Sequence, residues 1–212
     1  MNKDKLRSLC QKLSKETGIS FNSIQTHYFL ESILEKISIS DESNIFKGGF
    51  LLANVIGIRQ RSTVDIDFLI RKFTLTEENI KQRFEKILSS GHDNGITYTI
   101  QKIEEIRKED EYGGFRITVL CRLENIRQII PLDIATGDPI TPSDISYNYK
   151  SIFSDSLFKI CAYNIETILA EKIHTVYYRG IFNSRSKDFY DIYILYRLKS
   201  EKINYDMLRN AC

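Results

Sequence analysis

The chain has 212 residues, of which 42% are hydrophobic and 27% are charged, proportions that are ordinary for a soluble globular protein. Thirty basic and 28 acidic side chains leave a formal net charge of +2, so bulk charge does not identify a nucleic-acid-binding protein. No run of about 18 apolar residues is present, which argues against a transmembrane helix. With only 3 prolines and 10 glycines, the chain is not expected to contain long disordered stretches.

The cysteine pattern argues against a metal or disulfide framework. The four cysteines are far apart, with no CxxC spacing and no neighbouring histidine. We therefore expect them to act as small hydrophobic side chains in a reducing cytoplasm. The polar N-terminal residues have helical spacing and lack the apolar core of a signal peptide.

Two helices are predicted at the N-terminus. Leu6 and Cys10 lie on the apolar stripe of a helix over residues 2–16, which Gly18 ends. Ser23 is predicted to cap a second helix. We expect the pair to form a small helical lid or a docking surface.

From Asn44 the pattern alternates between strands and helices. The sequence predicts a strand ending at Phe46, a helix from Phe50 to Ile58, a strand from Val64 to Ile70 and a helix over 76–90. Three strand-like runs follow at 96–103, 114–121 and 127–134, and residues 157–162 are predicted to add an edge strand.

The C-terminal part is predicted to be helical. Asn164 is a candidate N-cap for a helix that runs to Tyr178, and Ser186 for a helix over 187–198, with a further helix beginning near the end of the chain. The predicted organisation is an N-terminal helical segment (1–43), an α+β catalytic core (44–162) and a C-terminal helical segment (163–212) that completes the active site.

The main candidate functional residues lie in two motifs, Lys47-Gly48-Gly49 and Asp65-Ile66-Asp67. Fifteen residues separate the two motifs. On a strand, residues i and i+2 point to the same face, so Asp65 and Asp67 project side by side. Their mutual repulsion calls for a divalent cation with oxygen ligands, most naturally Mg²⁺. Glycines at a strand-to-helix turn allow backbone N–H groups to approach a phosphate, next to the positive end of the following helix.

A third carboxylate would complete a two-metal site. The candidate is Asp133 in Pro131-Leu132-Asp133-Ile134. This aspartate lies on an apolar strand, where an unpaired charge is costly, so its presence there favours a role in the site. Two metal ions about 3.5–4 Å apart would activate a hydroxyl nucleophile and bind the leaving oxygens. A lone DxD is often a solvated strand face and a lone GG is often a turn, but their ordered combination with a later carboxylate strand favours a site.

The segments KGGFLLANVIGIRQRSTVDIDFLI, PLDIATGDPI, ETILAEKIHTVYYRG and RSKDFYDIYIL occur in this order over about residues 44–198. Together they resemble the nucleotidyltransferase superfamily that includes DNA polymerase β. More narrowly, they resemble the AbiEii/AbiGii toxins of abortive-infection and type IV toxin–antitoxin systems. The resemblance implies a polymerase β-like α+β core. The first motif has Gly48-Gly49 in place of the Gly-Ser of many nucleotidyltransferases, and Phe50 stands where relatives often carry a small polar residue.

The resemblance also implies further site residues. Lys172 matches the family's helical lysine. It lies at the edge of an apolar helix stripe, where it either extends to solvent or reaches into a cleft, and the predicted carboxylates favour the cleft. The family's fourth motif carries an aspartate after an Arg-x-x-Asp spacing, here Arg185 and Asp188, with Asp191 as a second acidic position. The remaining nucleotide-binding candidates are Lys47, Gly48, Gly49, Arg61, Ser62 and Lys172.

The predicted function is transfer of a nucleoside monophosphate from an NTP to an acceptor hydroxyl, with Asp65, Asp67 and Asp133 holding two Mg²⁺ ions, for which Mn²⁺ could substitute. The resemblance implies an RNA acceptor, such as the 3′ end of a tRNA, and a cognate antitoxin. Two alternatives stay open: a non-catalytic nucleotide-binding or interaction module that retains the fold, or a nucleotidyltransferase that acts on a protein or small molecule. The aromatic residues near the C-terminus are predicted to pack between helices rather than to stack on bases. They are Tyr177, Tyr178, Phe189, Tyr190, Tyr193 and Tyr196.

Overall fold

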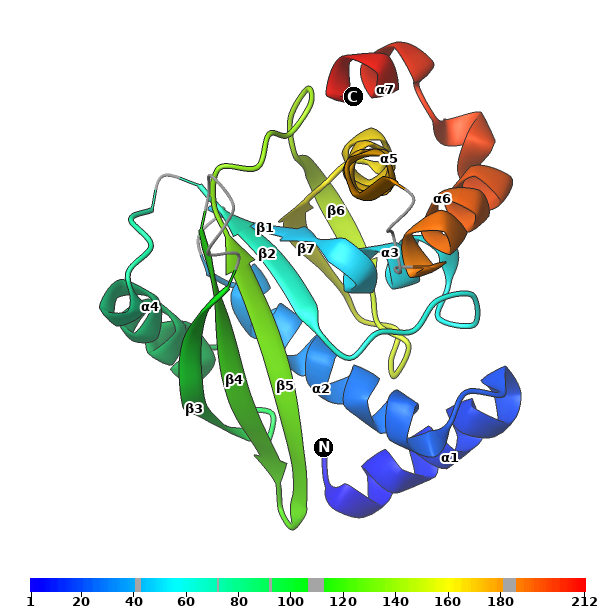
Figure 1. Cartoon of the computed structure of the whole chain (residues 1–212). Helices are drawn as coiled ribbons and strands as arrows, with labels where there is room; N and C mark the ends of the chain where they lie inside the picture. The colour runs from blue at the N-terminus through cyan, green and yellow to red at the C-terminus, as the bar shows by residue number, and fades with distance from the viewer. Residues whose placement is uncertain (41–42, 72, 92, 107–112, 181–185) are drawn as a thin grey trace.

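A computed structural model describes residues 1–40, 43–71, 73–91, 93–106, 113–180 and 186–212 (Figure 1). No helix in these described ranges is long and apolar enough to span a membrane. In chain order, the elements are α1 (Lys3–Thr17), α2 (Phe21–Ser38), β1 (Asn44–Lys47), α3 (Gly48–Ile56), β2 (Ile66–Ile70), α4 (Glu77–Ser89), β3 (Thr97–Ile106), β4 (Gly114–Leu123), β5 (Ile126–Ala135), β6 (Ile145–Lys150), β7 (Leu157–Ala162), α5 (Ile165–Arg179), α6 (Ser186–Lys199), a 3₁₀ turn (Ser200–Lys202) and α7 (Tyr205–Ala211).

The strands form a seven-stranded mixed sheet in the order β3-β4-β5-β2-β1-β7-β6. β2 is parallel to β5 and antiparallel to β1, and β1 is parallel to β7. The two outer hairpins, β3-β4 and β6-β7, are antiparallel. β1 and β2, joined through α3, therefore lie in the middle of the sheet, where neighbours on both sides fix their register.

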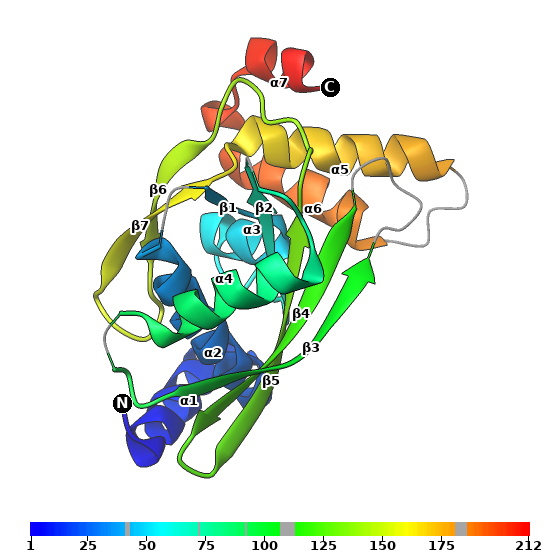
Figure 2. The same ribbon diagram turned by 90° about the vertical axis from the view of Figure 1, so that its left-hand side faces the viewer.

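Helices cover both faces of the sheet. α2 packs on β5, β7 and α4, and α4 also packs on β3. α3 contacts β1, β2 and α6, and α6 packs against α5. Figure 2 shows α4 in front of the strands and α3 and α6 behind them, with α5 lying along one end of the sheet.

The predicted α+β fold class is confirmed, with three differences in the elements. Ser20 rather than Ser23 caps α2, since its side chain accepts a hydrogen bond from the Ser23 N–H. β7 is not an edge strand, because β6, which the sequence analysis missed, pairs with its outer side. The prediction of a lid or docking surface is wrong for α2, whose Phe29 and Leu30 are fully buried in the core.

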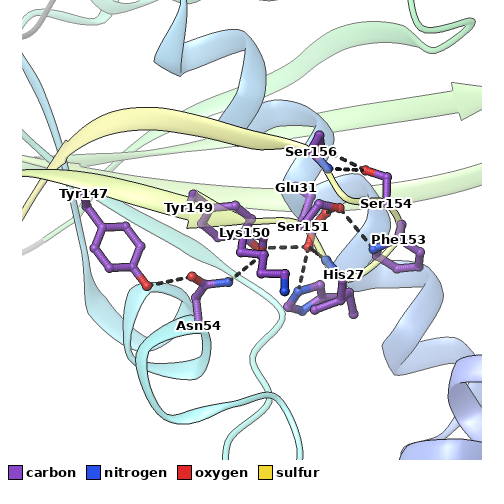
Figure 3. Close-up of polar contacts among 11 residues, drawn as sticks. His27, Glu31, Asn54, Tyr147, Tyr149, Lys150, Ser151, Phe153, Ser154 and Ser156 are labelled. Atoms are coloured by element: carbon purple, nitrogen blue, oxygen red, sulfur yellow. Dashed lines mark hydrogen bonds and ion pairs between the residues drawn. The ribbon is translucent and has the colours of Figure 1, made fainter.

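A buried carboxylate connects α2 to the turn between β6 and β7 (Figure 3). Glu31 accepts hydrogen bonds from the hydroxyls of Tyr149 at 3.1 Å and Ser151 at 2.5 Å. The backbone N–H of Ile152 donates a third hydrogen bond at 3.0 Å, and Nε2 of His27 lies 3.4 Å away. The Glu31 carboxylate therefore accepts hydrogen bonds from three donors at the end of β6 and in the turn that follows it.

Replacing Glu31 with alanine is expected to lower the free energy of unfolding by about 3 kcal/mol, because it leaves the donors of Tyr149, Ser151 and Ile152 without their acceptor. Glu35→Ala is the matched control. Glu35 is exposed one turn later on the same helix, and its loss should cost less than about 0.5 kcal/mol. Urea unfolding measures both variants, and equal losses would contradict the assigned role of Glu31.

Candidate active site

A row of charged side chains crosses four neighbouring strands at one level of the sheet. Lys47 on β1 pairs in register with Asp67 on β2, and Asp67 pairs with Asp133 on β5. Asp133 in turn pairs with Arg116 on β4. Because register partners on adjacent strands direct their side chains to the same face, the order across the sheet is cation, carboxylate, carboxylate, cation.

The carboxylates of this row are crowded together with that of Asp65, which directly precedes β2. Burial, followed by the charges of Asp65 and Asp133, raises the pKa of Asp67 from its ordinary 3.8 to about 6. Asp65 accepts a hydrogen bond from the Thr63 hydroxyl, which fixes the orientation of its carboxylate. The structure therefore concentrates more negative charge around Asp67 than its single neighbouring lysine offsets.

Gly48 brings the start of α3 directly against Asp67. The glycine has a φ of +74°, and a Cβ atom placed on it would lie 1.9 Å from Oδ2 of Asp67. A Cβ on Gly49 would lie 3.1 Å from Nη2 of Arg61. No side chain caps the N-terminus of α3. Its first N–H groups therefore open beside the carboxylates, in the arrangement that binds phosphate groups.

Gly48→Ala is expected to abolish nucleotide transfer, because the new methyl group must displace the Asp67 carboxylate. Gly18→Ala is the control for backbone strain alone, since Gly18 has a φ of +76° and nothing within 4 Å of its added Cβ. We expect the free energy of unfolding of the control to fall by about 1 kcal/mol and its activity to stay unchanged. Transfer assays and thermal melts distinguish the two variants. Transfer by Gly48→Ala at the wild-type rate would show that Gly48 is not part of the site.

Asp133 forms a bidentate ion pair with Arg116. Nε and Nη2 of Arg116 each donate a hydrogen bond to one carboxylate oxygen of Asp133 at 2.7 Å. The Arg116 side chain is 43% exposed, whereas that of Asp133 is 17% exposed. Both oxygens of Asp133 are therefore engaged by the guanidinium, and loss of this ion pair would free them.

Lys47 is engaged with carboxylates and is only 3% exposed. Its ammonium contacts Asp138 and Glu171 and lies 5.0 Å from the centre of the Tyr163 ring. Burial alone would lower the pKa of Lys47, but Glu171, Tyr163 and Asp138 together raise it above its ordinary value. Lys47 therefore stays charged and ties the end of β1 to α5. A phosphate contact for Lys47 stays a prediction.

A second ion cluster joins α5, α6 and the loop before β2. Nζ of Lys172 lies 2.7 Å from Oδ1 of Asp188 and 3.2 Å from Oδ2 of Asp191. Nε of Arg61 donates to Oδ1 of Asp191 at 2.8 Å. Asp191 therefore connects the lysine of α5 to the arginine that lies against Gly49. Both aspartates are 1% exposed.

The predicted residues thus fall into two groups. The first is the carboxylate row with Gly48 and Gly49, and the second is the Lys172 cluster with Arg61. Ser62 is exposed, and its backbone carbonyl accepts a hydrogen bond from Arg61. Arg185 lies outside the described residues. Sequence reasoning missed the ion-pair partners Arg116, Asp138 and Glu171, although Asp138 and Glu171 lie within the quoted motifs.

The donor set suits a hard divalent cation. Asp65 and Asp67 offer carboxylate oxygens, and burial together with the charges of Asp65 and Asp133 raises the pKa of Asp67, so a cation at this position would stabilise its ionised form. Among the described residues, no group of three His, Cys, Asp or Glu side chains has the spacing of a metal site. Asp65 and Asp67 therefore supply two oxygen donors that suit such a cation, whereas both oxygens of Asp133 are engaged by Arg116.

The chain is similar to known proteins in sequence pattern and in fold. A family model described as "Nucleotidyl transferase AbiEii toxin, Type IV TA system" matches residues 32–212. No curated protein matches the sequence. The crystal structure of JHP933 from Helicobacter pylori is similar, with a TM-score of 0.55 and 18% identity over 89% of this chain and 72% of that chain. A second Helicobacter pylori structure, described as a nucleotidyltransferase, has a TM-score of 0.55 and 19% identity over 89% of this chain and 74% of that chain.

At this level of identity the two structures establish the fold alone, and they confirm the predicted α+β fold class. The family model covers most of the chain and includes both ion clusters described above. The chain therefore belongs to the AbiEii family of nucleotidyltransferase toxins of type IV toxin–antitoxin systems.

Proposed function

We propose that this nucleotidyltransferase transfers a nucleoside monophosphate from an NTP to a hydroxyl of an RNA acceptor, with the 3′ end of a tRNA as the first candidate. Family membership implies a nucleotide substrate and an antitoxin. The RNA acceptor and the divalent-metal dependence are our proposals. The observation that carries the metal-dependent transfer is the carboxylate row of Asp67 and Asp133 at the uncapped N-terminus of α3, whereas the RNA acceptor rests on the family.

In the proposed reaction, the acceptor oxygen attacks the α-phosphorus of the NTP, and the bond from that phosphorus to the pyrophosphate oxygen breaks. Gly48 and Gly49 hold the triphosphate through the backbone N–H groups of α3. Asp65 and Asp67 would bind Mg²⁺, which supplies neutralising charge and lowers the pKa of the acceptor hydroxyl. Asp133, once released by Arg116, accepts the hydroxyl proton.

The second ion cluster, which contains Lys172 and Arg61, has a separate role in this proposal. The Lys172 ammonium is positioned by Asp188 and Asp191 on its helical side. It offers its remaining N–H bonds to phosphate oxygens as charge builds on the leaving pyrophosphate. Arg61, held by Asp191, keeps the loop before Asp65 against Gly49.

The test is incubation of the protein with each labelled NTP, Mg²⁺ and total cellular RNA, followed by gel separation of RNA and protein. We expect label in a discrete RNA band, and no label with Asp67→Ala. Label in protein bands or in small molecules would replace the RNA acceptor with another acceptor. Absence of label with every NTP and every acceptor would contradict the proposed activity.

A further inference from the structure

Exposed aromatic side chains are concentrated on the C-terminal helices. Within the described parts of the chain, every exposed large aromatic side chain lies on α5, α6 or α7. The exposed fractions are 85% for Tyr177, 81% for Tyr178, 56% for Tyr193 and 55% for Tyr196. The prediction that these rings pack between helices is therefore wrong, because a packing role would require them to be buried.

α6 has two faces of opposite character. Its inner face carries Asp188 and Asp191, which hold Lys172. Its outer face carries Phe189, Tyr193 and Tyr196, all at least half exposed. Spacings of four and three residues place these rings in one stripe, roughly 10 Å long at about 1.5 Å per residue.

The outer face also carries a cation. Both acidic residues of α6 are buried, whereas Arg197, which follows Tyr196, is exposed. Arg197 donates a hydrogen bond from Nη1 to the Tyr193 hydroxyl at 3.2 Å, which places its guanidinium beside the stripe. Aromatic rings beside a cation, without exposed carboxylates on the same helix, are complementary to a strand of bases and phosphates.

This face borders the site. The Tyr190 hydroxyl donates a hydrogen bond to the Gln60 carbonyl at 2.8 Å, on the loop that leads to Asp65. Phe189 follows Asp188 directly, so the first ring of the stripe belongs to the same helical turn as a Lys172 partner. A strand that lies along α6 would therefore reach the site with one end.

We propose that the outer face of α6 is a stacking platform for a single-stranded segment of the RNA acceptor, with Phe189, Tyr193 and Tyr196 stacking on bases and Arg197 contacting phosphates. This inference rests on the proposed RNA acceptor and assigns the surface that recognises it. A protein partner such as the antitoxin is the alternative occupant of the same face, and the experiment separates the two.

The test measures binding of a fluorescently labelled, unstructured oligoribonucleotide of about 12 nucleotides by anisotropy. Tyr193→Leu combined with Tyr196→Leu keeps apolar bulk and removes the aromatic faces, and we expect at least about tenfold weaker binding. Tyr193→Phe combined with Tyr196→Phe keeps the rings and should bind within about twofold of wild type. Leu157→Ala, on β7 and 65% exposed, controls for loss of unspecific apolar surface and should leave binding unchanged.

Transfer assays separate this inference from the proposed function. The leucine variant should raise the KM for RNA while keeping kcat at saturating RNA, and Arg197→Gln should reduce the salt dependence of binding. If RNA is labelled but the leucine variant binds and reacts like wild type, the platform is wrong and the proposed function stands. If the wild-type protein binds no RNA, and α6 is instead protected by the antitoxin in footprinting, the platform is wrong and the face belongs to the protein partner.

Discussion

Asp67→Asn is expected to reduce nucleotide transfer on the order of 10³-fold while making the metal-free protein more stable at pH 7. The activity falls because the neutral amide cannot hold a divalent cation beside the developing phosphate charge. The stability rises because the ionised carboxylate of Asp67 is buried beside Asp65 and Asp133. At a pKa of about 6 against 3.8 in the unfolded chain, the difference is on the order of 1–3 kcal/mol.

The pH dependence of this stabilisation has a definite sign. A carboxyl whose pKa is raised in the folded state binds more protons folded than unfolded, so its contribution to stability is present below about pH 4. It is lost as the pH rises to about 6. The melting temperatures of wild type and Asp67→Asn should therefore coincide near pH 4 and separate above pH 6. Mg²⁺ should raise the melting temperature of wild type alone, and a variant that melts below wild type at pH 7 would contradict this account.

Lys172→Met is expected to lower both the transfer rate and the stability. The rate should fall about 10²-fold, because a cation against the phosphates is lost. The free energy of unfolding should fall by about 3 kcal/mol or more, because Asp188 and Asp191 lose a buried ammonium partner. Lys159→Met removes an exposed lysine on β7 and should change neither quantity.

A double variant separates the two effects of Lys172. In Lys172→Met combined with Asp188→Asn, one buried carboxylate is neutral and needs no cation, so the melting temperature should recover in part. The rate should stay low, because no ammonium faces the phosphates. Recovery of rate together with stability would show that the lysine acts only by holding α5 against α6. Lys172→Arg restores the charge without the compact ammonium, and we expect only partial rescue.

The apolar periodicity of the sequence predicted most elements within a few residues. The helix predicted over 76–90 is α4, since Ile80 and Phe84 form a buried face and Thr76 supplies the cap. The strand β6 was missed because its residues Ile145–Lys150 alternate tyrosine with polar side chains and resemble a loop. Its identity depends on pairing with β7, which lies farther along the chain.

The site was partly predictable for a similar reason. The spacing of Asp65 and Asp67 at the start of β2 is a local property, so it can be read directly from the sequence. Their approach to Asp133 depends on the parallel pairing of β2 and β5, which the sequence analysis did not predict, although the charge of Asp133 on an apolar strand made it a candidate. The pairing of Lys47 with Glu171 joins residues 124 positions apart, and no local pattern records it. Ion-pair partners from distant strands and helices are the part that required the structure.

The dependence of Arg61 and Lys172 on Asp191 has a consequence for when activity can appear during synthesis. β1, α3 and β2 leave the ribosome well before α6 has been synthesised, because translation runs from the N-terminus. Until α6 docks, Asp191 cannot connect the loop before Asp65 to the lysine of α5. Nascent chains and products of broken messenger RNA that stop before α6 should therefore lack nucleotide transfer.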